Sequence, residues 1–162
     1  YPISTVGSHV SACPNHQNGR ITPLHTRGTV AMAGTFGYEL DISKMSDEDK
    51  EEVKAQIEDY KKYFDLIQGG DYYRLTKPEE AFMAWQFIST DMNKCLVNVV
   101  MTSAQANAPD CIVKLKGLNP YDDYMEADTG KVYNGRALMH GGYLLPKEMG
   151  EYQSYQLYFE RV

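Results

Sequence analysis

Apolar residues recur at helical spacing in one segment that precedes a pair of glycines. Intervals of three and four residues separate Val53, Ile57, Tyr60, Phe64 and Ile67. This spacing places the five side chains on one face of an amphipathic helix, predicted over residues 46–66. Ser46 and the acidic residues after it are typical of a helix N-terminus, and the glycines at 69–70 are typical of a helix end.

Shorter patterns precede this helix. The sequence predicts strands over residues 3–10 and 35–41, with a short helix over 26–33 between them. Two strands of this kind followed by a long amphipathic helix are typical of the β/α repeat of a (β/α)₈ TIM barrel. Because two strands cannot close a barrel, this interpretation requires further strands from other sequence.

Beyond the glycine pair, strand patterns alternate with turn signals at short intervals. The predicted strands cover residues 71–75, 81–89, 95–102, 111–116 and 152–161, and a helical turn is predicted over 136–140. About seven short strands are typical of an antiparallel β-sandwich with Greek-key-like connections. The predicted fold class is therefore α+β, with residues 1–68 as the end of a barrel and residues 69–162 as the sandwich.

Composition and charge disfavour several classes of protein. The net charge is −6, which disfavours binding to nucleic acid, and no apolar run approaches the roughly 18 residues of a membrane span. The cysteines, Cys13, Cys95 and Cys111, include no close-spaced pair, so a disulfide framework is not expected. Reduced thiols indicate a cytosolic protein.

The densest polar stretch runs from Ser8 to Arg20, and no Asp or Glu occurs before Glu39. Residue types that zinc prefers are present at His9, Cys13, His16 and His25. Their spacing matches none of the common structural zinc patterns. Cys13 with a neighbouring histidine is a candidate nucleophilic pair, but no oxyanion-hole motif accompanies it. Ordinary hydrogen bonding and packing in a loop explain the same residues more simply.

Two further groups are candidates for sugar chemistry. Glu39 and Asp41 share one face of a predicted strand, about 7 Å apart by strand rise, and paired carboxylates serve glycosidases. Capping and solvation are the alternative roles for such acids. Aromatic side chains that can stack on sugars are Tyr72, Tyr73, Trp85, Tyr152, Tyr155 and Tyr158. Aromatic residues on strands also pack in cores or in cross-strand pairs.

Several stretches carry a more specific signal. In order they are YPISTVGSHVS (1–11), PNHQ (14–17), GR (19–20), TPL (22–24), TRG (26–28), GTFGYELD (34–41) and GDYYRL (70–75). Together they closely resemble the α-galactosidases of glycoside hydrolase family 36. The resemblance continues more loosely at LKGL (115–118) and KVY (131–133).

The resemblance implies a retaining α-galactosidase that acts on melibiose, raffinose-type sugars and other terminal α-galactosides, with no cofactor and no metal. Family members combine an N-terminal β-supersandwich, a (β/α)₈ barrel and a C-terminal β-sandwich. The chain is expected to hold the last two barrel strands, the last barrel helix and the sandwich. The family's nucleophile and acid/base are aspartates on earlier barrel strands, expected upstream of Tyr1. No residue of this chain is therefore expected to be catalytic, and the chain alone is expected to be inactive.

Under this resemblance the polar stretch lies near the substrate-side rim of the barrel. The rim candidates are His9, Asn15, His16 and Gln17, which are expected to orient loops more than to contact sugar. The expected partners are a galactoside, the rest of the same polypeptide and further copies in a homo-tetramer, but neither nucleic acid nor a membrane. The expected location is the bacterial cytoplasm. The alternative function is a non-catalytic β-sandwich module that binds carbohydrate or stabilises the barrel and the oligomer.

Overall fold

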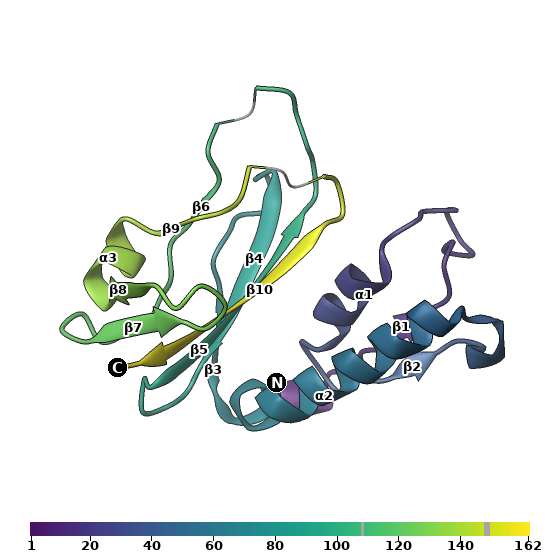
Figure 1. The fold of residues 1–162 in the computed structure, drawn as a ribbon, viewed down its shortest axis with the longest axis horizontal. Coiled ribbons are helices and arrows are strands. Elements are labelled where there is room, and N and C mark those ends of the chain that lie inside the picture. The colour runs from purple at the N-terminus through teal and green to yellow at the C-terminus, as the bar shows by residue number, and fades with distance from the viewer. Residues whose placement is uncertain (108, 148–149) are drawn as a thin grey trace. The chain divides into compact units, whose positions relative to one another are not determined.

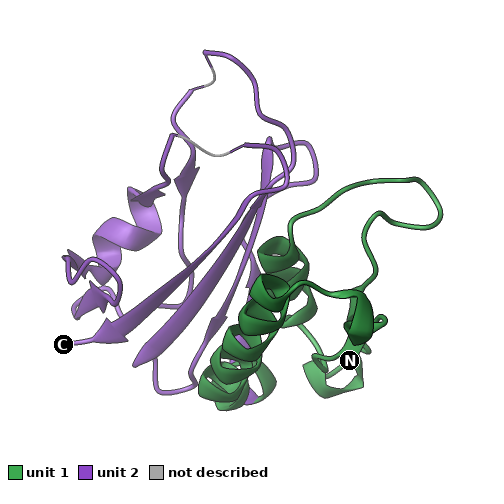
Figure 2. Ribbon diagram, turned by 45° about the vertical axis from the view of Figure 1, so that its right-hand side comes forward, with its two compact units in different colours: residues 1–68 green, residues 69–162 purple. Residues whose placement is uncertain are grey.

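The computed structural model describes residues 1–107, 109–147 and 150–162. The chain divides into two units, residues 1–68 and 69–162 (Figure 2). No helix within these described ranges combines the length and apolar character needed to cross a membrane.

The first unit contains two short parallel strands, each followed by a helix (Figure 1). Its elements are the 3₁₀ turn η1 (Ile3–Thr5), β1 (Val10–Ser11), α1 (Leu24–Ala31), β2 (Tyr38–Glu39), the 3₁₀ turn η2 (Ile42–Lys44) and α2 (Asp47–Gly69). Val10 pairs with Tyr38, and an isolated parallel bridge joins Gly7 to Thr35. The predicted mixture of helices and strands is confirmed.

The predicted N-terminal strands are longer than the observed ones. The prediction of a strand over 3–10 is wrong at its start, because the Thr5 amide and hydroxyl both donate to the Pro2 carbonyl and form a 3₁₀ turn. Regular pairing is confined to β1 and β2. The helix predicted over 26–33 is present and begins two residues earlier, at Leu24.

The long helix α2 confirms the prediction over 46–66 and continues to Gly69. Ser46 is its cap, since its hydroxyl accepts a hydrogen bond from the Asp49 amide at 3.1 Å. The predicted apolar stripe is partly wrong, because Phe64 is 47% exposed. The residues that α2 buries are Gln56, Tyr63, Leu66 and Ile67.

The second unit is built on a six-stranded antiparallel sheet, ordered β3-β4-β5-β10-β7-β8. These strands are β3 (Asp71–Arg74), β4 (Phe82–Ile88), β5 (Lys94–Met101), β7 (Asp123–Glu126), β8 (Val132–Asn134) and β10 (Ser154–Arg161). The predicted strands over 71–75, 81–89, 95–102 and 152–161 match four of them within two residues. The last strand, β10, lies between β5 and β7 in the middle of the sheet (Figure 1).

One face of this sheet is covered by a short strand pair and a helix (Figure 1). The pair is β6 (Ile112–Val113) with β9 (Tyr143–Leu144), and the helix is α3 (Gly135–His140), which confirms the helical turn predicted over 136–140. Val113, Leu138 and Leu145 pack against the sheet residues Val97 and Phe159. The strand predicted over 111–116 is reduced to the two residues of β6.

Candidate functional site

The two parallel strands of the first unit bring two loops together. Because parallel strands run in the same direction, the segments that follow β1 and β2 leave from the same edge of the pair. One is the connection to α1, residues 12–23, called here the 12–23 loop. The other leads into η2, whose preceding residue is Asp41.

The side chains of β1 alternate between two faces. Val10 is fully buried and clusters with Leu24 and Ala31 of α1. Because successive side chains on a strand point to opposite faces, His9 and Ser11 lie on the face of the strand opposite to Val10. This second face carries the polar groups of the strand pair.

The side chains of His9 and Glu39 lie within hydrogen-bonding distance of each other on that second face. The His9 Nε2 atom lies 2.6 Å from Glu39 Oε2, and their side chains are 48% and 75% exposed. The polar stretch from Ser8 to Arg20 therefore has a carboxylate partner, Glu39, on the neighbouring strand β2. Sequence reasoning missed this pair because His9 and Glu39 lie far apart along the chain.

Glu39 and Asp41 have different hydrogen-bonding partners. Asp41 accepts hydrogen bonds from the Ser43 amide at 3.1 Å and the Ser43 hydroxyl at 2.6 Å, and thereby caps η2. These hydrogen bonds, with a further one from Lys44, hold the pKa of Asp41 below its ordinary value. Asp41 has a capping role, which agrees with the capping alternative, whereas Glu39 pairs with His9, so the geometry does not support the interpretation of the two as a carboxylate pair.

The 12–23 loop is folded on itself around Asn15. The Asn15 side-chain oxygen accepts from the amides of Gln17 and Asn18 at 3.0 and 3.2 Å. The Asn15 amide donates to the Arg20 carbonyl at 2.9 Å. Asn15 therefore shapes the turn that displays His16 and Gln17, and both of these side chains are exposed.

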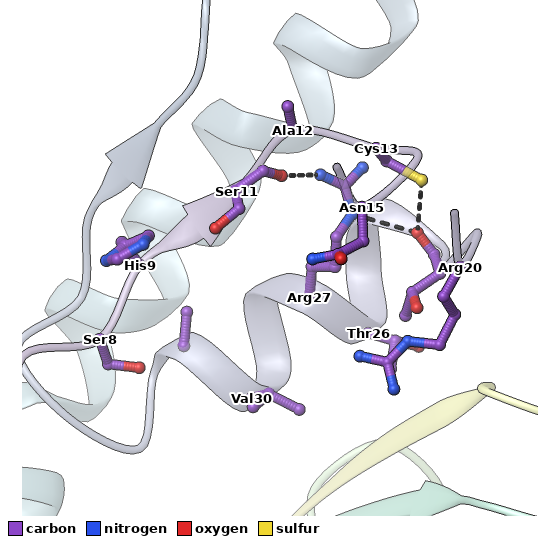
Figure 3. Close-up of a pocket in the computed structure, with 12 residues that line it drawn as sticks. Ser8, His9, Ser11, Ala12, Cys13, Asn15, Arg20, Thr26, Arg27 and Val30 are labelled. Carbon is purple, nitrogen blue, oxygen red and sulfur yellow. Dashed lines mark hydrogen bonds between the residues drawn. The ribbon is translucent and has the colours of Figure 1, made fainter. Parts of the chain in front are cut away.

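Arg27 of α1 closes the base of the same loop (Figure 3). Its Nη1 donates to the Ser11 carbonyl at 2.6 Å, and its Nε donates to the Thr22 carbonyl at 3.1 Å. The Cys13 thiol also donates to the Thr22 carbonyl, at 3.6 Å. Sequence reasoning did not single out Arg27, because its acceptors are backbone groups that no residue type reveals.

A pocket of about 200 Å³ lies between this loop, β1 and α1 (Figure 3). Its polar lining comes from Ser8, His9, Ser11, Asn15, Arg20, Thr22, Thr26 and Arg27. Hydroxyl, amide, imidazole and guanidinium groups of this kind suit a polar, uncharged or anionic ligand. Of the four rim candidates, His9 and Asn15 line the pocket, whereas His16 and Gln17 are not among its lining residues.

The zinc ligand types predicted from the sequence are not brought together. Within residues 1–107, 109–147 and 150–162, no three His, Cys, Asp or Glu side chains lie close enough to hold a metal ion. The Cys13 thiol donates a hydrogen bond to a backbone carbonyl, and the His9 side chain contacts Glu39. This geometry supports neither the zinc hypothesis nor the thiol–imidazole hypothesis.

The aromatic residues of the second unit are mostly covered. Trp85 is only 9% exposed and belongs to the core, which agrees with the core-packing alternative and not with sugar stacking at the surface. Tyr72 is 46% exposed, and its ring lies 5.6 Å from that of Phe87. The remaining candidates, Tyr73, Tyr152, Tyr155 and Tyr158, are half-buried.

Comparisons with known proteins match both units. The Melibiase family model matches residues 1–70, and the model of the glycosyl hydrolase family 36 C-terminal domain matches residues 82–159. The bifunctional α-galactosidase/sucrose kinase AgaSK of Mediterraneibacter gnavus is 49% identical over 163 residues, which cover 100% of this chain and 17% of AgaSK. α-Galactosidase AgaA of Geobacillus stearothermophilus is 46% identical over 155 residues, which cover 95% of this chain and 21% of AgaA.

Solved structures show the same similarity in three dimensions. The galactosidase domain of AgaSK superposes with a TM-score of 0.97 at 48% identity, over 100% of this chain and 23% of that domain. A variant of AgaA in complex with raffinose superposes with a TM-score of 0.96 at 44% identity, over 100% of this chain and 23% of that structure. The chain thus spans about a fifth of the length of the relatives it matches.

Proposed function

The chain belongs to glycoside hydrolase family 36, and we propose that it is the C-terminal part of a retaining α-galactosidase that hydrolyses melibiose, raffinose and other terminal α-galactosides. The observation that carries this proposal is the similarity of both units, in order, to α-galactosidases. One of the similar structures is a complex with raffinose, and another is a complex with stachyose.

In this proposal the first unit supplies the last two strands and the last helix of a (β/α)₈ barrel. Its support is the parallel pairing of β1 and β2 and the helix that follows each. The second face of the strand pair, with His9 and Glu39, is directed into the barrel. The second unit, with its six-stranded sheet covered on one face by β6, β9 and α3, is the C-terminal sandwich.

The proposed chemistry needs two carboxyl groups on other strands of the same barrel. In a retaining glycosidase one carboxylate forms a covalent glycosyl intermediate, while the second protonates the leaving oxygen and then activates water. The family resemblance assigns both roles to aspartates upstream of Tyr1. The residues of this chain then form part of the substrate-side rim of the barrel. His9 pairs with Glu39, and Asn15 shapes the 12–23 loop. His16 and Gln17 are exposed in the turn of that loop.

The complete protein is proposed to assemble as a homo-tetramer in the bacterial cytoplasm, as the family resemblance implies. Relatives from Geobacillus stearothermophilus and Lactobacillus acidophilus support a bacterial setting. Size-exclusion chromatography with light scattering on the full-length protein tests the assembly. A monomeric full-length enzyme contradicts this part of the proposal.

An activity assay on two forms of the protein tests the proposed function. The full-length protein is expected to release galactose from raffinose and p-nitrophenyl α-galactoside. The purified 162-residue chain is expected to release none, because it supplies neither of the two catalytic carboxylates. Circular dichroism of the chain provides the control that it is folded. Galactose release by the 162-residue chain alone, or none by the full-length protein, contradicts the proposal.

A second candidate function is that of a non-catalytic β-sandwich module. The exposed Tyr72 ring is the observation that favours carbohydrate binding by this unit. Isothermal titration of the chain with raffinose, and of the Tyr72→Ala variant as its control, tests this role. Heat that the variant loses supports sugar binding, whereas no heat from either chain favours a role in stabilising the barrel and the oligomer.

A further inference from the structure

One side chain holds both ends of the 12–23 loop. Ser11 is the last residue of β1, and Thr22 lies just before α1. The Arg27 guanidinium donates to the carbonyls of both. Because the two acceptors flank the loop, the position of this one guanidinium sets the distance between the ends of the loop.

The helix α1, which carries Arg27, is held in place by a buried side chain of α2. The side chain of Gln56 on α2 is 6% exposed, and its Nε2 donates to the Leu24 carbonyl at the start of α1, at 3.2 Å. The Oε1 atom of Gln56 accepts from the Tyr38 hydroxyl of β2, at 2.7 Å. Gly28, next to Arg27, has no room for a Cβ atom because the Gln56 amide fills that space. The helix that carries Arg27 is therefore held at its start and at Gly28 by the same Gln56 side chain of α2.

The chemistry of this contact requires arginine. A guanidinium is a rigid planar fork whose five N–H groups reach acceptors in different directions at once, whereas an ammonium is a compact point donor on a flexible stem. Arg27 lines the pocket beside β1, and it also lines a second hollow of about 270 Å³ with Leu40, Asp41 and Lys44. Arg27 therefore lies between the segment that follows β1 and the segment that follows β2.

We propose that Arg27 is a positioning residue for oligosaccharide recognition. It holds the 12–23 loop in the shape that presents His16 and Gln17 to the part of an α-galactoside beyond the terminal galactose. This inference rests on the proposed function, under which the carboxyl ends of the strands form the face that receives substrate. Both tip residues are exposed, and their imidazole and amide groups can hydrogen-bond sugar hydroxyls.

The test compares two substrates in the full-length enzyme with the Arg27→Lys substitution. Raffinose carries hydroxyl groups beyond its galactose, whereas p-nitrophenyl α-galactoside carries none there. We expect the KM for raffinose to rise roughly tenfold, because a loop displaced by an ångström or less misplaces its contacts. Because p-nitrophenyl α-galactoside lacks those hydroxyl groups, we expect its KM to rise by less than the KM for raffinose. Arg74→Lys, at an exposed position of β3, is the matched control.

Each outcome decides one question. An unchanged KM for raffinose in Arg27→Lys overturns the inference. An equal loss on both substrates, together with a lower melting temperature, also overturns it, because that result reports general destabilisation. No galactose release by the unsubstituted enzyme from either substrate contradicts the proposed function instead.

Chemical rescue gives a second measurement. In Arg27→Ala, added guanidinium ion at millimolar concentration is expected to restore part of the activity on raffinose, because it can occupy the site between the two carbonyls. Methylammonium at the same concentration is the control ion and is expected to restore less. Equal effects of the two ions on a folded variant contradict the role of the planar fork.

Discussion

Glu126 is a buried carboxylate that accepts hydrogen bonds from the residues of the turn that follows it. Its side chain is 1% exposed and accepts hydrogen bonds from the Asp128 amide at 3.1 Å and from the Thr129 amide and hydroxyl at 2.9 and 2.5 Å. Burial raises the pKa of Glu126, but these hydrogen bonds outweigh burial and hold the pKa below its ordinary value. The ionised carboxylate therefore stabilises the folded second unit.

Substitution of this residue should make stability less dependent on pH. A lowered folded-state pKa means that the carboxylate contributes stability above its unfolded pKa of about 4.3 and loses it as the pH falls through the folded value. We expect Glu126→Gln to lower the free energy of unfolding by about 1–3 kcal/mol at pH 7 and by less at pH 3. Urea unfolding at the two pH values measures both, with the exposed Glu160→Gln as control. Equal stability of Glu126→Gln and the unsubstituted protein at pH 7 contradicts this role.

Gly28 permits a second prediction at the scale of one residue. Alanine normally stabilises a helix by about 1 kcal/mol relative to glycine, but a Cβ atom at Gly28 overlaps the buried Gln56 amide. Overpacking of this kind costs about 1–3 kcal/mol, so Gly28→Ala is expected to lower the melting temperature. The control is Gly37→Ala, where a Cβ atom meets nothing within 4 Å. A higher melting temperature for Gly28→Ala contradicts the packing described for Gln56.

Single residues of the candidate site were predictable only in part. His9 and Asn15 were found because their residue types suggest polar chemistry, and both line the pocket. Arg27 was not found, because its partners are two backbone carbonyls that the sequence does not distinguish from any others. The pairing of His9 with Glu39 depends on the register of two parallel strands, which the pattern of apolar residues does not specify when the strands are so short.

At the scale of elements, the cap of α2 is open to a direct test. The Ser46 hydroxyl satisfies the Asp49 amide, one of the free amides of the first turn. We expect Ser46→Ala to cost about 1 kcal/mol of unfolding free energy and Ser46→Asp to restore it, because aspartate is an equally good cap. Thermal unfolding of the two variants checks this. A Ser46→Asp variant no more stable than Ser46→Ala contradicts the capping role.

Long elements were predicted well and short ones poorly. The helix α2 and the strands β4 and β5 were found within three residues of their ends, because each carries a repeated pattern and clear turn signals. The elements β1, β2 and β6 have two residues each, too few to show any period. Their boundaries are set by partners distant in the sequence, as Ile112 of β6 is by Leu144.

At the scale of the whole molecule, the order of the strands makes the two halves of the sheet in the second unit depend on β10, which joins them. β10 joins β5 through seven residue pairs, from Ser154–Val100 to Glu160–Lys94, and joins β7 through three. Removal of residues 154–162 is therefore expected to divide the sheet and to abolish cooperative unfolding of this unit. Calorimetry of the shortened protein measures the loss. A sharp transition that persists in the shortened protein contradicts the central role of β10.

The central place of β10 also has a consequence during synthesis. The strands β4 and β5 leave the ribosome well before β10, their later neighbour in the sheet. The backbone N–H and C=O groups along the free edge of β5 therefore stay unpaired while translation continues. Pairing between segments so distant in the chain is slow, and an uncovered strand edge can pair with another nascent chain. The yield of soluble protein is therefore expected to depend on chaperones and on the speed of translation past residue 101.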